Sequence, residues 1–297
     1  MNVVEQRLEI VVGPESHKKR LDEYLFGRFG GLSKMYLRGI VKDEKCEVNG
    51  RFENVGYRIK QNDFIEIELD LSRETAMRPQ EMPLDIIYED DDLIVVNKPA
   101  GMLVHPTNRD KSGTLLNALS FHLNREINGG ESVRPGLIHR LDKQTSGLIV
   151  VSKTLKAHKK MMESFRRKFV EKRYVALVEG VIENDAGTIE APIGRFGELK
   201  YWGVKEDGKP SETRYSVLKR NEGTTLLELE PVTGRTNQLR IHCEHIGHPI
   251  VGDVARGGRE FERLCLHAYR LAFRHPRTME TVTFEAEPDC HFFETAG

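Results

Sequence analysis

Hydrophobic residues near the start of the chain recur at helical spacing. Apolar side chains from Leu21 to Phe29 lie three to four residues apart, and Gly30 and Gly31 then interrupt the pattern. A second apolar run of the same spacing follows within residues 35–41, with Ser33 as its expected N-cap. Residues 18–45 are therefore predicted to form two short helices.

The pattern changes to alternation after these helices. Cys46–Phe52 carries an Asn-Gly pair between two short stretches, which is the strongest local signal for a β-hairpin. From Phe64 to Leu69, isoleucine and leucine alternate with glutamate, as in a strand with one buried face. We predict a small α+β domain over residues 1–75, followed by an acidic, proline-containing linker at residues 76–83.

The rest of the chain contains many strand patterns and few helical ones. The strand candidates are short and are bounded by turn residues. They are LIVVNKPAG, GLIVVSK, RYVALVEG, GTIEAPIG, TRYSVL and TLLELEPV. Strands that follow one another without regular helical crossovers favour an antiparallel or mixed sheet. We therefore expect an α+β domain over residues 76–297.

Two helices are expected within this second domain. The first begins near Thr154, and basic residues occupy most of its polar positions. Its apolar face is predicted to contain Leu155, Met162, Phe165 and Phe169. The second helix is expected at about residues 236–246.

Composition narrows the class of protein. With 297 residues and 38% hydrophobic content, the chain can bury one sizeable core and a small satellite core. No run approaches the roughly 20 apolar residues of a membrane-spanning helix, and the first residues do not resemble a secretory signal. The four cysteines form no CxxC pair. We expect a cytoplasmic protein with reduced thiols and no membrane partner.

Charge is segregated along a chain whose net charge is only −1. Lys18–Lys60 contains eleven basic and six acidic residues, and Lys153–Arg173 contains nine basic and two acidic residues. Asp63–Asp92 instead contains eleven acidic and two basic residues. Such segregation can create basic surfaces that attract phosphate backbones, although ordinary solvated helix faces are an equal alternative.

The densest cluster of reactive side chains surrounds Asp142. The segment from Arg134 to Lys153 reads RPGLIHRLDKQTSGLIVVSK, so this aspartate lies among basic residues just before an apolar strand. A carboxylate on a turn beside a rigid strand is well placed to meet a substrate. We expect the neighbouring cations to hold its pKa below the reference value of about 3.9, which suits a nucleophile. An aspartate that only caps a turn is the alternative.

This segment, through its HRLDKQTSGLIVVSK run, resembles the signature of the RluA-type pseudouridine synthases. Other motifs of that family are matched in the family's order across residues 84–288. They are NKPAGM (97–102), EKRYVALVEG (171–180), PVTGRTNQLRIH (231–242), GHPIVGD (247–253), LHA (266–268) and FRHP (273–276). The resemblance implies an α+β, mixed-sheet catalytic domain that isomerises uridine in RNA and uses neither a metal nor another cofactor.

The resemblance also implies roles for single residues. Asp142 matches the family's nucleophilic aspartate, which could attack either the base or the ribose. Tyr174 matches a tyrosine expected to stack on the target base and to assist proton removal from carbon 5. Arg240 is our choice for the cation paired with Asp142, and Arg235 is the second choice. Arg140 matches an arginine that enters the RNA stack where the base leaves.

The N-terminal segment resembles a small RNA-binding domain first known from a ribosomal small-subunit protein. RLDEYL (20–25), LSK (32–34) and VNG (48–50) carry this likeness. It implies that Arg20, Lys34 and Arg38 contact RNA phosphates and shape rather than bases. Three positions depart from the usual patterns: Lys34 replaces an arginine, Glu44 a glycine and Asn237 a histidine.

Several alternatives remain at this stage. An accessory RNA-binding domain favours large-subunit ribosomal RNA as the substrate, with transfer RNA as the alternative. A non-catalytic RNA-binding protein would be expected to lack Asp142 or Tyr174, and both are present. A zinc hydrolase would need the HExxH spacing, which His242, His245 and His248 do not have. A monomer is the default expectation.

Overall fold

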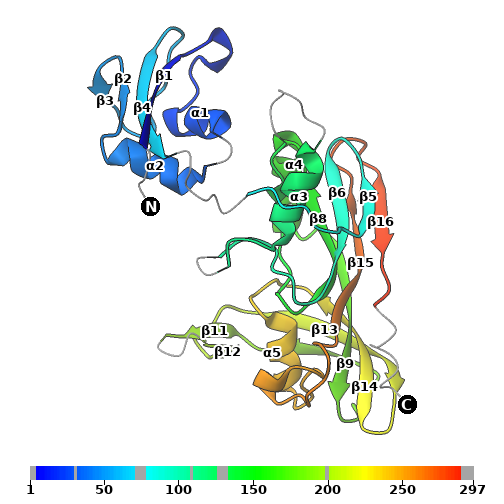
Figure 1. The fold of residues 1–297 in the computed structure, drawn as a ribbon. Helices are drawn as coiled ribbons and strands as arrows, with labels where there is room; N and C mark the ends of the chain where they lie inside the picture. Colours follow the sequence, from blue (N-terminus) through cyan, green and yellow to red (C-terminus); the bar gives the residue numbers. More distant parts are fainter. Residues whose placement is uncertain are drawn as a thin grey trace. The chain divides into compact units, whose positions relative to one another are not determined.

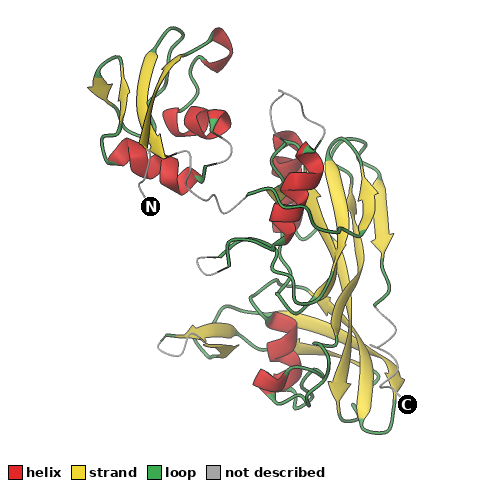
Figure 2. Cartoon of the chain, viewed as in Figure 1, coloured by secondary structure: helices red, strands yellow, loops and turns green. Residues whose placement is uncertain are grey.

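The computed structural model describes residues 5–29, 32–70, 78–107, 110–125, 133–197 and 201–288. The chain forms two compact units, which Figure 1 and Figure 2 show by element. Unit 1 comprises Met1–Glu81 and His105–Arg134, and unit 2 comprises Met82–Val104 and Pro135–Gly297. The expected border after residue 75 and residues 76 and 77 of the predicted linker lie outside the described residues, and residues 78–83 form neither helix nor strand. The domain border and the linker both stay predictions.

Unit 1 combines a small antiparallel sheet with short helices. Its elements are β1 (Glu5–Val11), η1 (Pro14–Ser16), α1 (Leu21–Arg28), α2 (Lys34–Lys42), β2 (Cys46–Val48), β3 (Arg51–Phe52), β4 (Phe64–Asp70) and α3 (Leu115–Asn124). The strands are ordered β1-β4-β2-β3. Side chains from α1, α2, β2 and β4 form one continuous hydrophobic core.

The local sequence signals in this unit predicted its helix cap, hairpin turn and alternating strand correctly. The Ser33 hydroxyl accepts a hydrogen bond from the Tyr36 amide at 3.1 Å and caps α2 as predicted. Asn49 and Gly50 both have positive φ, 53° and 69°, as a two-residue hairpin turn between β2 and β3 requires. Strand β4 buries every second residue. The Gly30-Gly31 break lies outside the described residues.

Two elements of unit 1 were not predicted. Strand β1 pairs with β4 along its whole length, from Glu5 opposite Asp70 to Val11 opposite Phe64. Helix α3 begins at a capping box in which Thr114 and Asn117 each bond to the other's backbone amide. Strand β1 was missed because it depends on its distant partner β4. Helix α3 was missed because its capping box has asparagine at a position more often filled by Glu or Gln.

Unit 2 is built on one large sheet. Its elements are β5 (Ile86–Glu89), β6 (Leu93–Lys98), β7 (Gly136–Leu137), β8 (Ser146–Ser152), α4 (Leu155–Arg166), β9 (Glu171–Glu179), β10 (Ala186–Glu190), β11 (Ile193–Phe196), β12 (Tyr201–Val204), β13 (Glu212–Arg220), β14 (Thr224–Pro231), α5 (Gln238–His245), η2 (Val254–Arg256), β15 (Leu266–Arg274) and β16 (Thr281–Glu285). Nearly all of its strand pairs are antiparallel, and β15 with β8 is a parallel pair. The expected α+β class with a mixed sheet is confirmed.

The order of this sheet, β10-β13-β14-β9-β15-β8-β6-β5, brings distant motifs together. Strands β8 and β9 both neighbour β15, although some twenty residues and a helix separate them along the chain. One hydrophobic core lies around β9, β14 and α5, and another around β6, β8 and α4. No helix in the described part of the chain is long and apolar enough to cross a membrane.

Two predictions for unit 2 were wrong in detail. GTIEAPIG forms two strands, β10 and β11, because Pro192 lacks the amide that a continuous ladder would need. Helix α4 begins after Thr154 as predicted but buries Ala157 and Met161, one step around the helix from the expected face. Leu155, Met162 and Phe169 are exposed by 81%, 44% and 67%.

Candidate active site

Asp142 lies on a tight turn directly before the most buried strand of unit 2. The Thr145 amide donates to the Asp142 carbonyl oxygen at 3.2 Å and closes this turn. Every residue of β8 is buried. Gly147 has a φ of 113°, and a Cβ there would lie only 2.4 Å from the Ala268 carbonyl oxygen of β15. A glycine is therefore required for the two strands to approach closely enough to fix the turn.

The Asp142 carboxylate is surrounded by cations yet has a raised pKa. Burial raises the pKa of Asp142, and four cations offset this effect only in part. In decreasing order of influence they are Arg240, Arg140, Lys98 and Arg256. The expectation of a lowered pKa was wrong, because it counted the neighbouring charges and not the loss of water around the carboxylate.

The charge of Arg240 acts on Asp142, although the Arg240 guanidinium is hydrogen-bonded to a different carboxylate, that of Asp253. It donates to both carboxylate oxygens of Asp253, each at 2.7 Å, and the Asp253 side chain is only 2% exposed. Among the four cations it is nevertheless the one that lowers the pKa of Asp142 most. The second choice, Arg235, donates to the Pro210 carbonyl oxygen at 3.3 and 3.4 Å.

Asn237, the departure from the family pattern, stands immediately before α5. Its backbone is left-handed, with φ 54° and ψ 22°, a conformation that asparagine and histidine adopt more readily than most residues. Its side-chain oxygen accepts a long hydrogen bond of 3.4 Å from Arg240. Gln238 anchors the helix start by donating to the Glu212 carbonyl oxygen at 2.9 Å. Asparagine thus satisfies the backbone demand of this position and contacts the arginine.

Arg256 is a buried cation that the sequence motifs did not indicate. Its side chain is 4% exposed and forms an ion pair with Glu244 at 2.5 Å. It also donates to the Tyr201 hydroxyl at 3.1 Å and lies 4.0 Å from Asp253. The carboxylates of Asp253 and Glu244 therefore hold two arginines close to Asp142 without that residue's help.

Lys98, in the NKPAGM motif, is a second cation near Asp142 that was not predicted as a site residue. It is fully buried, and its ammonium donates to the carbonyl oxygens of Pro99, Met102 and Lys143 at 2.8, 2.9 and 3.3 Å. Burial lowers the pKa of Lys98 to about 8, although the charge of Asp142 opposes the shift. Because Lys143 belongs to the Asp142 turn, this lysine ties the end of β6 to that turn.

Tyr174 lies on β9, opposite Leu229 of β14, and senses the charge of Asp142. Burial raises the pKa of Tyr174 well above its ordinary value of 10, and the nearby Asp142 carboxylate raises it further. The phenol therefore keeps its proton at neutral pH. This protonation state favours a role as a stacking surface or hydrogen-bond donor and disfavours the expected role in removing a proton.

His139 fixes the other side of the turn that carries Asp142. Its Nε2 atom accepts a hydrogen bond from the Val150 amide at 3.1 Å, and its ring stacks on Phe165 of α4 at a centroid distance of 4.8 Å. Burial lowers the pKa of His139 to about 3, so the ring is neutral. The next residue, Arg140, is exposed and still acts on Asp142, as a group that meets RNA would.

The three basic residues assigned to RNA contact in unit 1 gather around one carboxylate. Asp22 is 1% exposed and forms ion pairs with Arg20 and Arg38, both at 3.0 Å. Lys34 acts on the same carboxylate and lies 5.9 Å from the Phe26 ring. The structure thus brings Arg20, Lys34 and Arg38 together, with the two arginines about a third and nearly a half exposed.

The histidines in and just after α5 serve the fold. His242 is hydrogen-bonded to the Ala191 carbonyl oxygen at 3.1 Å, and His248 to the Glu179 carbonyl oxygen at 2.7 Å. Within the described ranges, no group of three or more His, Cys, Asp or Glu side chains is arranged to hold a metal ion. These contacts disfavour the zinc hydrolase alternative.

Comparison with known proteins gives a consistent result. Residues 92–245 match the family described as RNA pseudouridylate synthase. The chain is 39% identical to an uncharacterized RNA pseudouridine synthase, YlyB, of Bacillus subtilis (strain 168), and the match covers 94% of each chain. It is 34% identical to the ribosomal large subunit pseudouridine synthase D of Haemophilus influenzae, covering 97% of this chain and 93% of that protein.

A solved structure agrees with the sequence comparison. The human RNA pseudouridylate synthase domain containing 1 matches with a TM-score of 0.59 and 32% identity. The match covers 72% of this chain and 86% of the human one.

All members of the acid-and-cation cluster around Asp142 lie in unit 2.

Proposed function

The chain belongs to the RNA pseudouridylate synthase family, and from this premise we propose that it isomerises uridines of large-subunit ribosomal RNA with Asp142 as the nucleophile. The observation that carries the proposal is the state of the Asp142 carboxylate. It is partly exposed and lies among four cations, and none of them forms an ion pair with it within the described residues. Such a carboxylate has no fixed partner to displace before it can attack the substrate.

The reaction needs few groups. The glycosidic bond from uracil N1 breaks, the uracil turns within the site, and carbon 5 bonds to the ribose carbon that N1 left. The proton on carbon 5 is lost and N1 gains one, so atoms balance without an oxidant or a group donor. The protein has to hold a detached base and supply one carboxylate, for which confinement is the main requirement.

The residues around Asp142 have distinct parts in this proposal. The Tyr174 ring offers a surface on which the extruded base can stack. Arg240, held by Asp253, stabilises negative charge that develops on the base or the carboxylate without neutralising Asp142 beforehand. Arg140 is exposed and can replace the extruded base in the RNA stack.

Two observations support ribosomal RNA as the substrate. Relatives that align over most of the chain are named ribosomal large subunit pseudouridine synthase D. Arg20, Lys34 and Arg38 gather in unit 1, where they can bind phosphates of structured RNA. Transfer RNA is the alternative substrate. The proposal also implies a cytoplasmic protein that acts as a monomer and needs no cofactor.

Tritium release from RNA labelled at uracil carbon 5 tests the activity. Wild type should release tritium and Asp142→Ala should not, while Asp207→Ala, at a side chain 74% exposed, serves as the matched control. Mapping of pseudouridines by reverse transcription in a deletion strain then tests the target. Loss of marks from large-subunit ribosomal RNA is expected, and loss of a transfer RNA mark alone would overturn that assignment.

A further inference from the structure

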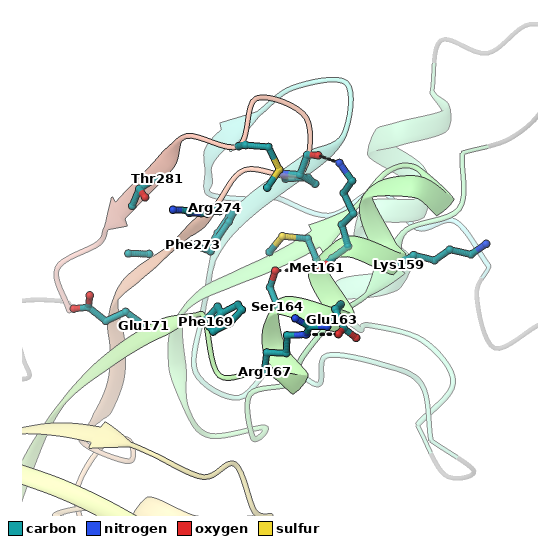
Figure 3. Close-up of a pocket in the computed structure, with 14 residues that line it drawn as sticks. Lys159, Met161, Glu163, Ser164, Arg167, Phe169, Glu171, Phe273, Arg274 and Thr281 are labelled. Atoms are coloured by element: carbon teal, nitrogen blue, oxygen red, sulfur yellow. Dashed lines mark hydrogen bonds and ion pairs between the residues drawn. The ribbon is translucent and has the colours of Figure 1, made fainter.

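A hollow of about 860 Å³ lies in unit 2 between helix α4 and the β15–β16 hairpin. Its floor is apolar and contains Met161, Ala272 and Phe273, which are buried. Figure 3 shows Phe169 and Phe273 beside this hollow, with Arg167 on the helix side and Arg274 on the hairpin side. None of the residues that line it takes part in the Asp142 cluster described above.

Phe169 is an exposed aromatic ring on a fixed backbone. Helix α4 ends at Arg166, and Lys168 follows it with a φ of 59°. The Phe169 amide donates to the Ser164 carbonyl oxygen at 2.9 Å. These features form a Schellman motif, in which the residue at the Phe169 position normally packs back onto the helix. Phe169 is instead 67% exposed. A large ring is thus held at the mouth of the hollow and is open to a ligand.

The charge around the hollow is positive because its acids are already paired. Glu163 is bound by Arg166 and Arg167, which lower the pKa of its carboxyl. Glu171 forms ion pairs with two further arginines, Arg173 and Arg270, each at 3.4 Å.

Of the remaining cations on the rim, Lys160 is hydrogen-bonded, whereas Lys159 and Arg274 are available to a ligand. Lys160 donates to the Pro276 carbonyl oxygen at 2.7 Å and links the two walls. In the described part of the chain, Lys159 and Arg274 form no ion pair, and both are exposed. An anionic ligand would therefore be attracted electrostatically to this rim, whereas an apolar peptide without acidic residues would not.

We propose that this hollow binds a single-stranded RNA segment that flanks the target uridine, with one base stacked on Phe169 and phosphates near Lys159 and Arg274. An aromatic ring beside a basic groove is the usual means of binding single strands without reading sequence. Phe169 precedes Tyr174 of β9 by five residues, which span at most roughly 17 Å of chain. RNA whose base lies at Tyr174 can therefore reach the hollow within a few nucleotides. The inference rests on the proposed function, since that makes RNA the ligand.

Binding of a fluorescent eight-residue oligouridylate, compared with an abasic oligonucleotide of equal length, tests the inference. Phe169→Ala should weaken oligouridylate binding about tenfold and leave abasic binding unchanged, since it removes one stacking surface. Arg274→Glu should weaken both and lower the salt slope by about one. Lys219→Glu is the charge-matched control. Lys219 is an exposed residue of β13, and two strands, β14 and β9, separate β13 from β15 in the sheet.

The conservative variant Phe169→Trp adds a direct signal. It should keep the affinity, and oligouridylate should quench its fluorescence beyond that of Trp202, the single native tryptophan. Unchanged oligouridylate affinity in Phe169→Ala would overturn the inference. Because binding is measured without turnover, a wild type that binds but forms no pseudouridine would instead count against the proposed function.

Discussion

Two aspartates, one in each unit, lie among cations and have opposite pKa shifts. At Asp22, burial raises the pKa, but the hydrogen bond from Arg20 and the charges of Arg20, Lys34 and Arg38 outweigh it, and the net pKa is lowered. At Asp142, burial raises the pKa and the surrounding cations do not outweigh it. The difference is direct contact. Cations that bind a carboxylate stabilise its charge, whereas cations held by other acceptors leave it reactive.

The other acceptors in unit 2 can be named. Asp253 holds Arg240, Glu244 holds Arg256, and three backbone carbonyl oxygens hold Lys98. These partners keep the cations close to Asp142 and prevent them from collapsing onto it. Among the described residues, the Arg20 guanidinium donates its hydrogen bonds to Asp22, at 3.0 and 3.3 Å, and no other carboxylate holds it.

Asp142→Asn gives the largest expected effect. Turnover should fall at least about 10³-fold, equivalent to about 4 kcal/mol of barrier, because the proposed nucleophile is lost. The variant should be no less stable than wild type at pH 7, since a raised pKa means that ionised Asp142 weakens the fold. Thermal melting should show that any advantage of the variant shrinks as pH falls through the raised pKa and vanishes below the ordinary value of 3.8.

Asp22→Asn should have the opposite profile. Unit 1 should lose about 2 kcal/mol of stability at pH 7, less than for a fully buried pair because Arg20 and Arg38 are 35% and 45% exposed. Since the folded pKa of Asp22 is lowered, this loss should be largest above pH 3.8 and should disappear as pH falls through the lowered pKa. Turnover at saturating RNA should persist. Denaturant unfolding at several pH values measures the loss, and a loss that grows toward low pH would contradict the account.

Asp253→Asn tests whether the partner of Arg240 keeps Asp142 reactive. A released Arg240 can turn toward Asp142, so the pKa of Asp142 should fall. The acid limb of kcat/KM should then move to lower pH, by about one unit if a direct ion pair forms. An unmoved acid limb in a folded variant would show that Asp253 does not control Asp142.

Asn237→His should have the smallest effect. Both residues tolerate the left-handed backbone at the start of α5, and both can accept from Arg240. We expect kcat/KM within about threefold of wild type and an unchanged melting temperature. Asn237→Val is the contrasting control, because a β-branched residue is strained at positive φ and should lower stability by about 1–3 kcal/mol.

Local signals allowed much of this molecule to be predicted from sequence. The Asn49-Gly50 hairpin, the Ser33 cap and the turn before β8 depend on neighbours in the chain, and each was read correctly. Asp142 and Tyr174 came from family motifs, and the structure places them within electrostatic reach of each other.

What escaped prediction depends on residues far apart in sequence. Strand β1 was missed because its partner β4 begins more than fifty residues later. The raised pKa of Asp142 depends on burial and on Asp253, about 110 residues away, holding Arg240. The buried face of α4 is set by its packing against β8 and not by the number of apolar residues on each face of the helix. Sequence patterns do not record desolvation, and desolvation decides how this site behaves.

Titration of the side-chain carboxyl carbons by NMR tests the central claim most directly, because Asp22 and Asp142 are read in the same protein. The account predicts that Asp142 titrates above 3.8 and Asp22 below it, and that Asp253→Asn moves only the Asp142 value, downward. If Asp142 titrated below Asp22 in the wild type, the claim that indirectly held cations leave this carboxylate reactive would be contradicted.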